Sequence, residues 1–468
     1  MAESGGSRRR GNSKLEIAVL VVVVAGLVTV PYLIDRLARQ LSDYDRQPGS
    51  SVAETEEECM APSPVLTPDG HYVFFETSID SLVPGDTNGC VDVFRRDLRS
   101  GEVVRASVGP KGEQWKGHSF APSPSADGSV VAFTYVPLGK GGKAYREDHE
   151  VVVKSLTTGA VTHPAPSVKT EGFMWPASDQ PTLSGDGHTL AFATSGKLLP
   201  EDTNNLEDIY LADLARGKLS MPSPNSGPKP GMDHSDQTVL SGDGRYLFYR
   251  AQRYDLLKPS SVYSAGLLRR DLRTGDQTPV VPLSSDFSVA VRSDPVSVSR
   301  DGQRVVYTRR LTAKSGDLDG GGRPWTPHAM LTDLKTHRTV RLDPAGKDKD
   351  ADLGARAPAI SAQGRYVVFM SAEGLGHKRN ERQVYWNDTQ TGTLRLASCT
   401  AAGVAGKALS GGQTVSEDGR YVAFDTTAAN LLPGKSRAPE DVVVKDMKTG
   451  ELFWATRPGT PKWVAVGR

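Results

Sequence analysis

A short polar turn followed by an apolar run recurs along most of the chain. The turn reads Ser or Thr, any residue, Asp and Gly, as in TPDGHYVFF from Thr67 and SEDGRYVAF from Ser416. The seven turn glycines are Gly70, Gly128, Gly187, Gly244, Gly302, Gly364 and Gly419. Their spacings are 58, 59, 57, 58, 62 and 55 residues, and a period of this size indicates a repeat architecture.

A second turn lies about midway between successive glycines, for example RRDLRSG in the first repeat and VKDMKTG in the last. Asp-Gly and Thr-Gly pairs between β-rich runs favour hairpins, because glycine readily adopts the positive φ that such turns require. Each repeat is therefore predicted to contain four antiparallel strands. In the first repeat these strands lie near Ser63–Thr67, His71–Thr77, Val91–Leu98 and Glu102–Val108.

Seven four-stranded units without helices between them predict an all-β fold, a seven-bladed β-propeller. A single four-stranded sheet exposes both of its faces, whereas in a ring each blade covers the faces of its neighbours. We expect one propeller domain over residues 61–468. Its predicted blades cover about 61–120, 121–179, 180–236, 237–294, 295–357, 358–411 and 412–468.

The repeat motifs also resemble those of a known family. The Pro-x-x-Ser-x-Asp-Gly strand pair, DTNGCVDVFRRDLRSG in the first blade and EDVVVKDMKTG in the last look like TolB-like β-propeller repeats of exported bacterial proteins. This resemblance covers about 400 residues and implies the fold, but propellers of this type act as binding platforms, assembly factors or enzyme lids. Two blades depart from the pattern: Gln363 replaces the turn Asp of blade six, and His337 replaces a turn Gly of blade five.

The N-terminal region predicts a membrane anchor. Ile17–Ile34 is a stretch of 18 residues without a charged side chain, and a helix of that length extends about 27 Å, close to the bilayer core of about 30 Å. Arg8–Arg10 and Lys14 precede it, so the N-terminus is expected in the cytoplasm. We expect a cytoplasmic tail over 1–14, an uncleaved signal-anchor helix over 15–35, a polar stalk over 36–60, and a propeller outside the cytoplasm. A cleaved signal peptide is the alternative.

Charge and composition narrow the classes of partner. The chain has 56 Lys and Arg against 55 Asp and Glu, which gives no basic field for nucleic acid. Its 48 glycines and 31 prolines fit a turn-rich fold, and its three cysteines exclude a disulfide-built fold. Cys59 lies at the entry to the first blade and Cys90 in the connection between its second and third strands, and we expect them to form a disulfide outside the cytoplasm.

The long connections of a propeller share one face, here called the loop face, and the tight hairpin turns share the other, the turn face. Binding residues are expected on the loop face. Aromatic and His side chains gather in its connections, where they suit sugar stacking or partner docking; the alternative is packing over the blade tops. The candidate residues are Trp115, His118, Phe173, Trp175 and His234.

Two sets of carboxylates lie in the same connections. Asp179, Asp236 and Asp294 each precede the turn Asp of their own blade by seven residues, so they are expected at equal heights around the channel, where they suit a cation or a basic group. The alternative is that each caps a turn. Asp86, Asn88 and Asp92 alternate in the manner of calcium ligands; the alternative is a hydrogen-bonded loop without metal.

No catalytic constellation is recognised. The sequence contains no Gly-x-Ser-x-Gly, His-Glu-x-x-His or phosphate-binding loop motif. We therefore expect a non-enzymatic binding or scaffold module for a protein or an envelope polymer, with no cofactor other than calcium. The alternative is a carbohydrate-active lyase or hydrolase at the channel mouth, in which His118, His149, His234 and His328 converge.

Overall fold

The computed structural model describes residues 64–139, 149–165, 179–203, 207–222, 232–255, 262–284, 295–310, 327–343, 354–372, 382–432 and 441–457. All of them belong to the compact unit Cys59–Arg468. Within these ranges no helix combines the length and the apolar character that a membrane span needs. The predicted anchor over 15–35 and the stalk over 36–60 lie outside the described residues.

The predicted seven blades of four antiparallel strands are confirmed. Each blade consists of four consecutive strands paired in chain order. The strands are β1 (Val65–Leu66), β2 (Tyr72–Thr77), β3 (Asp92–Asp97) and β4 (Val103–Arg105) in blade one; β5 (Gly117–Pro124), β6 (Val130–Pro137), β7 (Glu150–Ser155) and β8 (Val161–Ala165) in blade two; β9 (Asp179–Leu183), β10 (Thr189–Thr194), β11 (Asp208–Asp213) and β12 (Lys218–Ser220) in blade three; β13 (Met232–Leu240), β14 (Tyr246–Asp255), β15 (Val262–Asp271) and β16 (Gln277–Ser284) in blade four; β17 (Ser297–Val298), β18 (Arg304–Arg310), β19 (Pro327–Asp333) and β20 (Arg338–Arg341) in blade five; β21 (Arg356–Ile360), β22 (Tyr366–Ser371), β23 (Gln383–Asp388) and β24 (Thr393–Leu396) in blade six; and β25 (Ser410–Val415), β26 (Tyr421–Thr426), β27 (Val442–Asp446) and β28 (Leu452–Trp454) in blade seven. One short 3-10 helix, η2 (Asp80–Leu82), lies between β2 and β3.

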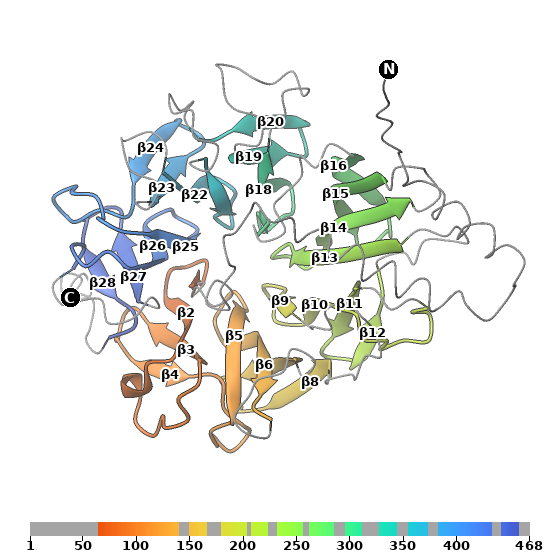
Figure 1. Ribbon diagram of the computed structural model, residues 1–468, viewed down its shortest axis with the longest axis horizontal. Helices are drawn as coiled ribbons and strands as arrows, with labels where there is room; N and C mark the ends of the chain where they lie inside the picture. Colours follow the sequence, from red (N-terminus) through yellow and green to blue (C-terminus); the bar gives the residue numbers. More distant parts are fainter. Residues whose placement is uncertain are drawn as a thin grey trace, which may run out of the picture. The chain divides into compact units, whose positions relative to one another are not determined.

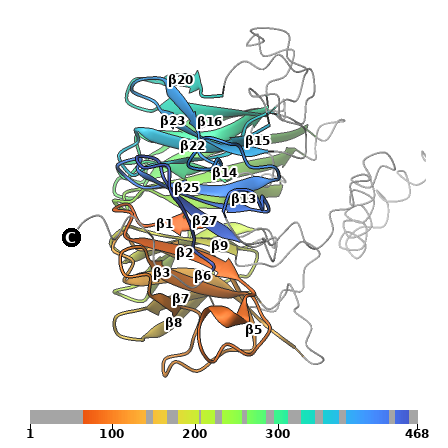
Figure 2. The ribbon, with the colours of Figure 1, turned by 90° about the vertical axis from the view of Figure 1, so that its left-hand side faces the viewer.

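The blades surround a common axis. The first strand of a blade, such as β5, β9, β13 or β25, lies nearest the centre, and the fourth lies at the rim (Figure 1). Figure 2 shows the same sheets edge-on. Connections between second and third strands and between blades therefore lie on the loop face, and the remaining hairpins lie on the turn face.

The Ser-x-Asp-Gly motif builds the hairpin between the first and second strands. In blade seven, Ser416 Oγ donates to Asp418 Oδ1 at 2.6 Å, and the same oxygen accepts the N–H of Arg420 at 2.9 Å. Ser416 Oγ also accepts the N–H of Tyr421 at 2.9 Å. Gly419 completes the turn at φ +72°, a conformation that costs other residues free energy. The polar groups of the hairpin are thus satisfied locally, which explains why the motif recurs.

An ion pair joins this hairpin to the second hairpin of the same blade. Arg420, directly after the turn glycine, contacts Asp446 at 2.8 Å, and that Asp also accepts backbone N–H groups of its own turn. Among the described residues, Arg245 and Arg365 hold the same position and contact Asp271 and Asp388. His71 holds it in blade one and is hydrogen-bonded to Asp97, whereas in blade five the residue that contacts Asp333 is Arg304, two positions after the glycine. The turn face is therefore braced inside each of these blades.

Apolar side chains fill the spaces between blades. The centre of each second strand carries a buried aromatic residue, and burial of such a side chain contributes about 1.5–3 kcal/mol. The members are Phe75, Phe133, Phe192, Phe248, Tyr307, Phe369 and Phe424. The ring closes because Leu66 and Phe75 of blade one pack in one cluster with Val442 and Val444 of blade seven. In the described chain, no blade borrows a strand from the other end of the sequence.

The innermost strands extend further towards the loop face than the predicted blade boundaries. β5 begins at Gly117 and β13 at Met232, whereas the repeat pattern places the blade starts at 121 and 237. The pairing shifts register within both strands, and Ala121 and Gln237 have φ of 54° and 49°. Such a β-bulge breaks the period of two that the sequence pattern relies on, while the strand continues beyond it.

Candidate functional site

The three predicted calcium ligands lie together, and an internal cation already contacts both of the carboxylates. Arg105 Nη1 lies 2.9 Å from Asp86 Oδ1 and 3.5 Å from Asp92 Oδ2. Asn88 donates its amide N–H to Asp92 Oδ2 at 3.1 Å, while its carbonyl oxygen accepts the N–H of Cys90 at 2.9 Å. Both carboxylates and the guanidinium are almost fully buried.

The cluster is part of a contact that recurs around the ring. In four blades of the described chain, the residue at or near the start of the third strand is hydrogen-bonded to the residue 15 positions later. The pairs are Asp92 with Ser107, His328 with Asp343, Gln383 with Ser398 and Asp441 with Thr456, at 2.5, 2.9, 2.7 and 2.9 Å. Each pair closes the loop-face end of its blade. The fixed spacing is the sequence signal that would have identified Ser107 and its equivalents.

The electrostatics of the cluster agree with a structural role. Burial raises the pKa of Asp86 and the pKa of Asp92, although Arg105 acts in the opposite direction on both. The carboxylates therefore depend on Arg105 and their hydrogen bonds to remain charged in this environment. This arrangement favours the alternative of a hydrogen-bonded loop, and calcium binding stays a prediction. Among the described residues, no three His, Cys, Asp or Glu side chains form a metal-binding group.

Trp115 and His118 are half-buried. The Trp115 ring packs against Tyr135 with ring centres 4.9 Å apart, and against Phe133 at 6.2 Å. His118 Nδ1 accepts the N–H of Val91 at 3.1 Å, and burial lowers the pKa of His118. Burial thus disfavours the charged form of the imidazole, and Nδ1 serves as the acceptor in this contact. The two side chains fit packing over the blade top, although each keeps a partly exposed surface.

The predicted carboxylate ring is described only through its backbone. Asp179 begins β9 opposite Ala193, and Asp236 in β13 lies opposite Arg250, so the two occupy corresponding positions in neighbouring blades. The side chains of Asp179, Asp236 and His234 are not among the described ones. Other predicted residues lie entirely outside the described ranges, namely Phe173, Trp175, Asp294 and Cys59.

The predicted disulfide is described from one side only. Cys90 is buried and has no disulfide partner among the described residues, and its Sγ lies 3.6 Å from the carbonyl oxygen of Asn88. Because Cys59 is outside the described ranges, the Cys59–Cys90 bridge stays a prediction.

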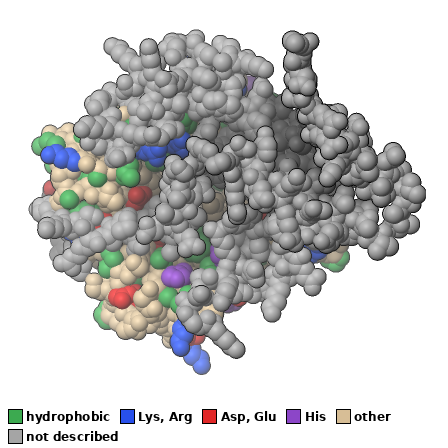
Figure 3. All heavy atoms as spheres, in the orientation of Figure 1, with side chains coloured by type: hydrophobic (Ala, Val, Ile, Leu, Met, Phe, Trp, Pro, Cys, Tyr) green, Lys and Arg blue, Asp and Glu red, His purple; other side chains and the backbone are tan. Residues whose placement is uncertain are grey.

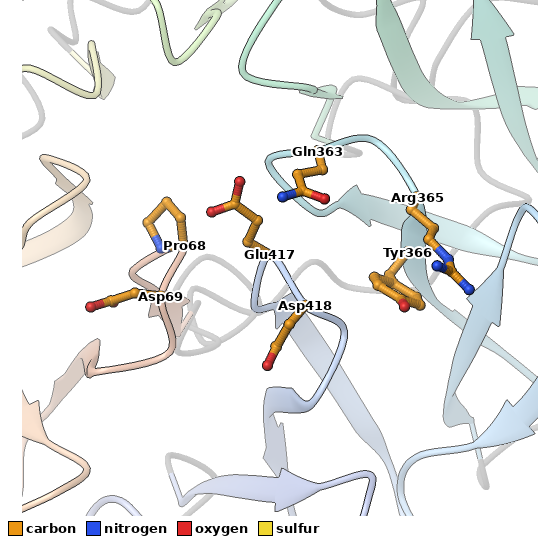
Figure 4. A pocket seen from close by; sticks show the side chains of 7 residues that line it. All are labelled: Pro68, Asp69, Gln363, Arg365, Tyr366, Glu417 and Asp418. Carbon is orange, nitrogen blue, oxygen red and sulfur yellow. The ribbon is translucent and has the colours of Figure 1, made fainter.

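In the part of the loop face that Figure 3 leaves uncovered, the coloured charged side chains lie apart from one another. A cavity of about 350 Å³ lies instead on the turn face. Hairpins of blades six, seven and one surround it (Figure 4). Its lining residues are Pro68, Asp69, Gln363, Arg365, Tyr366, Glu417 and Asp418. The sequence predicted binding on the other face, and the cavity was missed because it lies among tight turns.

Comparison with known proteins shows a similarity in fold only. No protein-family model matches the sequence, and no curated protein sequence matches it either. Similar solved structures include TolB from Acinetobacter baumannii (14% identity, TM-score 0.40, 70% of this chain and 63% of that one), so this chain spans less than two thirds of that TolB. They also include the propeller domain of the Trilobed protease from Pyrococcus furiosus (11%, 0.49, 86% and 100%) and oligogalacturonate lyase from Vibrio parahaemolyticus (12%, 0.38, 69% and 88%). TolB proteins, which the repeat motifs resemble, are thus among the similar structures, and the seven-bladed propeller itself rests on the strand pairing described above.

Proposed function

We propose that this chain is a membrane-anchored propeller outside the cytoplasm that binds a protein or an envelope polymer without turning it over. The anchor is the apolar stretch Ile17–Ile34, and the near-zero net charge disfavours nucleic acid as the partner. The propeller is the binding body, with its long connections on one face.

One observation carries the non-enzymatic part of the proposal. Three described loop-face side chains that could act as an acid, a base or a ligand instead make contacts that hold the blades together. His328 is buried against Asp343 at 2.9 Å, His118 accepts a backbone N–H, and Asp92 is bonded to Ser107. A general acid or base needs a free position facing the substrate, whereas these groups support a rigid binding surface.

The competing function is a carbohydrate-active enzyme, and one experiment separates the two. The purified full chain is incubated with envelope polysaccharides and with a polyuronate, with and without Mn²⁺. Binding is measured by co-sedimentation, and bond cleavage is measured from the masses of the products. We expect the chain to retain its polymer, or a protein partner captured by cross-linking, with the mass of that partner unchanged. The amount retained should fall in a Trp175→Ala variant. The proposal would be overturned by cleavage of the polymer that is abolished when His118, or a single Asp of the loop face, is replaced by Ala.

A further inference from the structure

Blade two lacks the contacts that close the loop-face end of four other blades. In blades one, five, six and seven, the N–H directly after the fourth strand donates to a carbonyl of the third strand, 13 residues earlier. The bonds are Ala106 to Val93, Leu342 to Ala329, Ala397 to Val384 and Ala455 to Val442, at 2.8 to 2.9 Å. Blade two has Pro164 at this position, which has no N–H to donate. Ala165 follows, where those four blades carry the side chain that bonds the start of the third strand.

A charged pair that is buried in blade one is therefore exposed in blade two. Glu150 and His163 follow Asp92 and Arg105 by one repeat of 58 residues. In blade one the side chains of Arg105 and Asp92 are 9% and 2% exposed. In blade two His163 Nδ1 contacts Glu150 Oε2 at 3.1 Å, and the two side chains are 43% and 22% exposed. The repeat thus presents at the surface of blade two a carboxylate and an imidazole whose equivalents support the interior of blade one.

Two aromatic rings lie beside this exposed pair. Tyr135 on β6 is directly opposite Glu150 on β7, so their side chains share one face of the sheet. The Trp115 ring centre lies 4.9 Å from that of Tyr135 and 6.2 Å from that of His163 on β8. The Tyr135 hydroxyl donates to the carbonyl of Lys116 at 3.2 Å, which ties the segment of Trp115 to β6. Three strands and the connection before β5 therefore hold the four side chains together.

Three polar atoms of this cluster are not used by the fold. Within the ranges that the structure describes, no hydrogen bond reaches Trp115 Nε1, Glu150 Oε1 or His163 Nε2, and none of the three atoms is buried. Trp115 and Tyr135 are themselves only half-buried. An indole N–H, a carboxylate oxygen and an imidazole nitrogen thus surround aromatic surface that is open to solvent.

We propose that Trp115, Tyr135, Glu150 and His163, here called the blade-two site, bind a neutral hexose unit of a polysaccharide, and this rests on the proposed envelope-polymer partner. The C–H face of the sugar ring would lie against Trp115, and neighbouring hydroxyls would meet Glu150 and His163. A hydroxyl both donates and accepts, so it can pair with the carboxylate oxygen and with the indole N–H. Aromatic surface with a few fixed polar groups is typical of sites for small polar ligands. The charge of Glu150 disfavours acidic sugar units.

The test uses the purified full chain in a polyoxyethylene detergent, which carries no sugar, and three neutral probes: maltohexaose, cellohexaose and mannohexaose. Binding is detected by saturation-transfer difference NMR and its affinity is measured by calorimetry. At least one probe should bind. Trp115→Ala should weaken that binding at least tenfold, and Glu150→Gln and His163→Ala about three- to tenfold each. Because Trp115 also packs against the blade, thermal unfolding of each variant is compared with that of the parent protein.

The matched control is His188→Ala, because His188 forms a similar exposed pair with Asp186 at 3.5 Å in a turn-face hairpin. This control should bind the probe like the parent protein, and a mixture of tryptic peptides should not displace the sugar. The proposal would be overturned if no probe binds, if Glu150→Gln and His163→Ala bind like the parent, if His188→Ala loses as much, or if peptides displace the sugar. Those results would leave the proposed function standing, because it is measured separately through Trp175→Ala and the mass of the retained partner.

Discussion

The glycine that ends each inner hairpin is predicted to have two roles, and Gly419 separates them. Its φ of +72° disfavours any side chain, and a Cβ added there would lie 2.5 Å from Cγ and 2.6 Å from Cδ2 of the Tyr366 ring in the preceding blade. Gly392 in a rim hairpin has nearly the same φ, +73°, but a Cβ added there has no atom within 4 Å. The pair therefore differs in packing and hardly in backbone conformation.

Gly392→Ala should cost about 1–2 kcal/mol of unfolding free energy, the cost of a left-handed backbone for a non-glycine residue. Gly419→Ala should cost the same and, in addition, about 1–3 kcal/mol for overpacking against the ring. Urea unfolding of the full chain, followed by tryptophan fluorescence, measures both variants. Equal losses in the two variants would refute the idea that the turn glycines form part of the contact between blades.

A rescue variant gives the same test from the other side. Blade two carries Val130 where blade six carries Tyr366, and a Cβ added to Gly187 would meet Val130 at an ordinary 3.4 Å. In a Tyr366→Val background, Gly419→Ala should therefore cost no more than Gly392→Ala does. A double-mutant cycle should give a coupling of about 1–3 kcal/mol, and additive effects would contradict the contact.

Four further predictions concern charge, conformation and redox state. Burial raises the pKa of Asp425 to about 7 from 3.8, so the folded state holds this proton more tightly and the free energy of unfolding should fall as the pH rises from 4 to 7. Above pH 7 the Asp425→Asn variant should exceed the parent protein in unfolding free energy by up to about 4 kcal/mol, measured by urea unfolding. The same pH dependence of stability in the parent protein and the variant would refute this. Arg105→Met leaves two buried carboxylates without a counter-charge and should lower the free energy of urea unfolding by about 3–5 kcal/mol. A loss of less than about 1 kcal/mol, typical of a solvent-exposed ion pair, would contradict this. His337 has a φ of 55° in a turn, so His337→Gly should raise the free energy of unfolding by about 0.5–1 kcal/mol. A lower urea midpoint in the variant would contradict this. Intact mass with and without reductant should show the Cys59–Cys90 bridge, and two or more alkylatable thiols in the unreduced protein would exclude it.

The fold was predictable because its signals are local and repeated. Ser416, Asp418 and Gly419 satisfy one hairpin by themselves, and seven such hairpins at a period near 58 residues leave few architectures open. Blade boundaries were less predictable, since the bulge at Ala121 and its equivalents lets the inner strand continue beyond the break in its pattern.

The candidate site was less predictable, because its contacts join distant positions. The spacing of Asp86, Asn88 and Asp92 suggested calcium, and no local pattern shows that Arg105, from the next hairpin arm, lies among them. The turn-face cavity likewise depends on Gln363 and on which hairpins meet across the ring. The one sign of this cavity in the sequence was Gln363, which replaces the turn Asp in blade six.

The central claim is that the propeller binds its partner without cleaving or modifying it, and mass spectrometry of the partner tests this most directly. The full chain is incubated with an envelope polymer or peptide that it retains, and the bound material is released and weighed. The account predicts a partner recovered with its covalent mass unchanged at every time of incubation. A time-dependent cleavage product that disappears in the His118→Ala variant would contradict it.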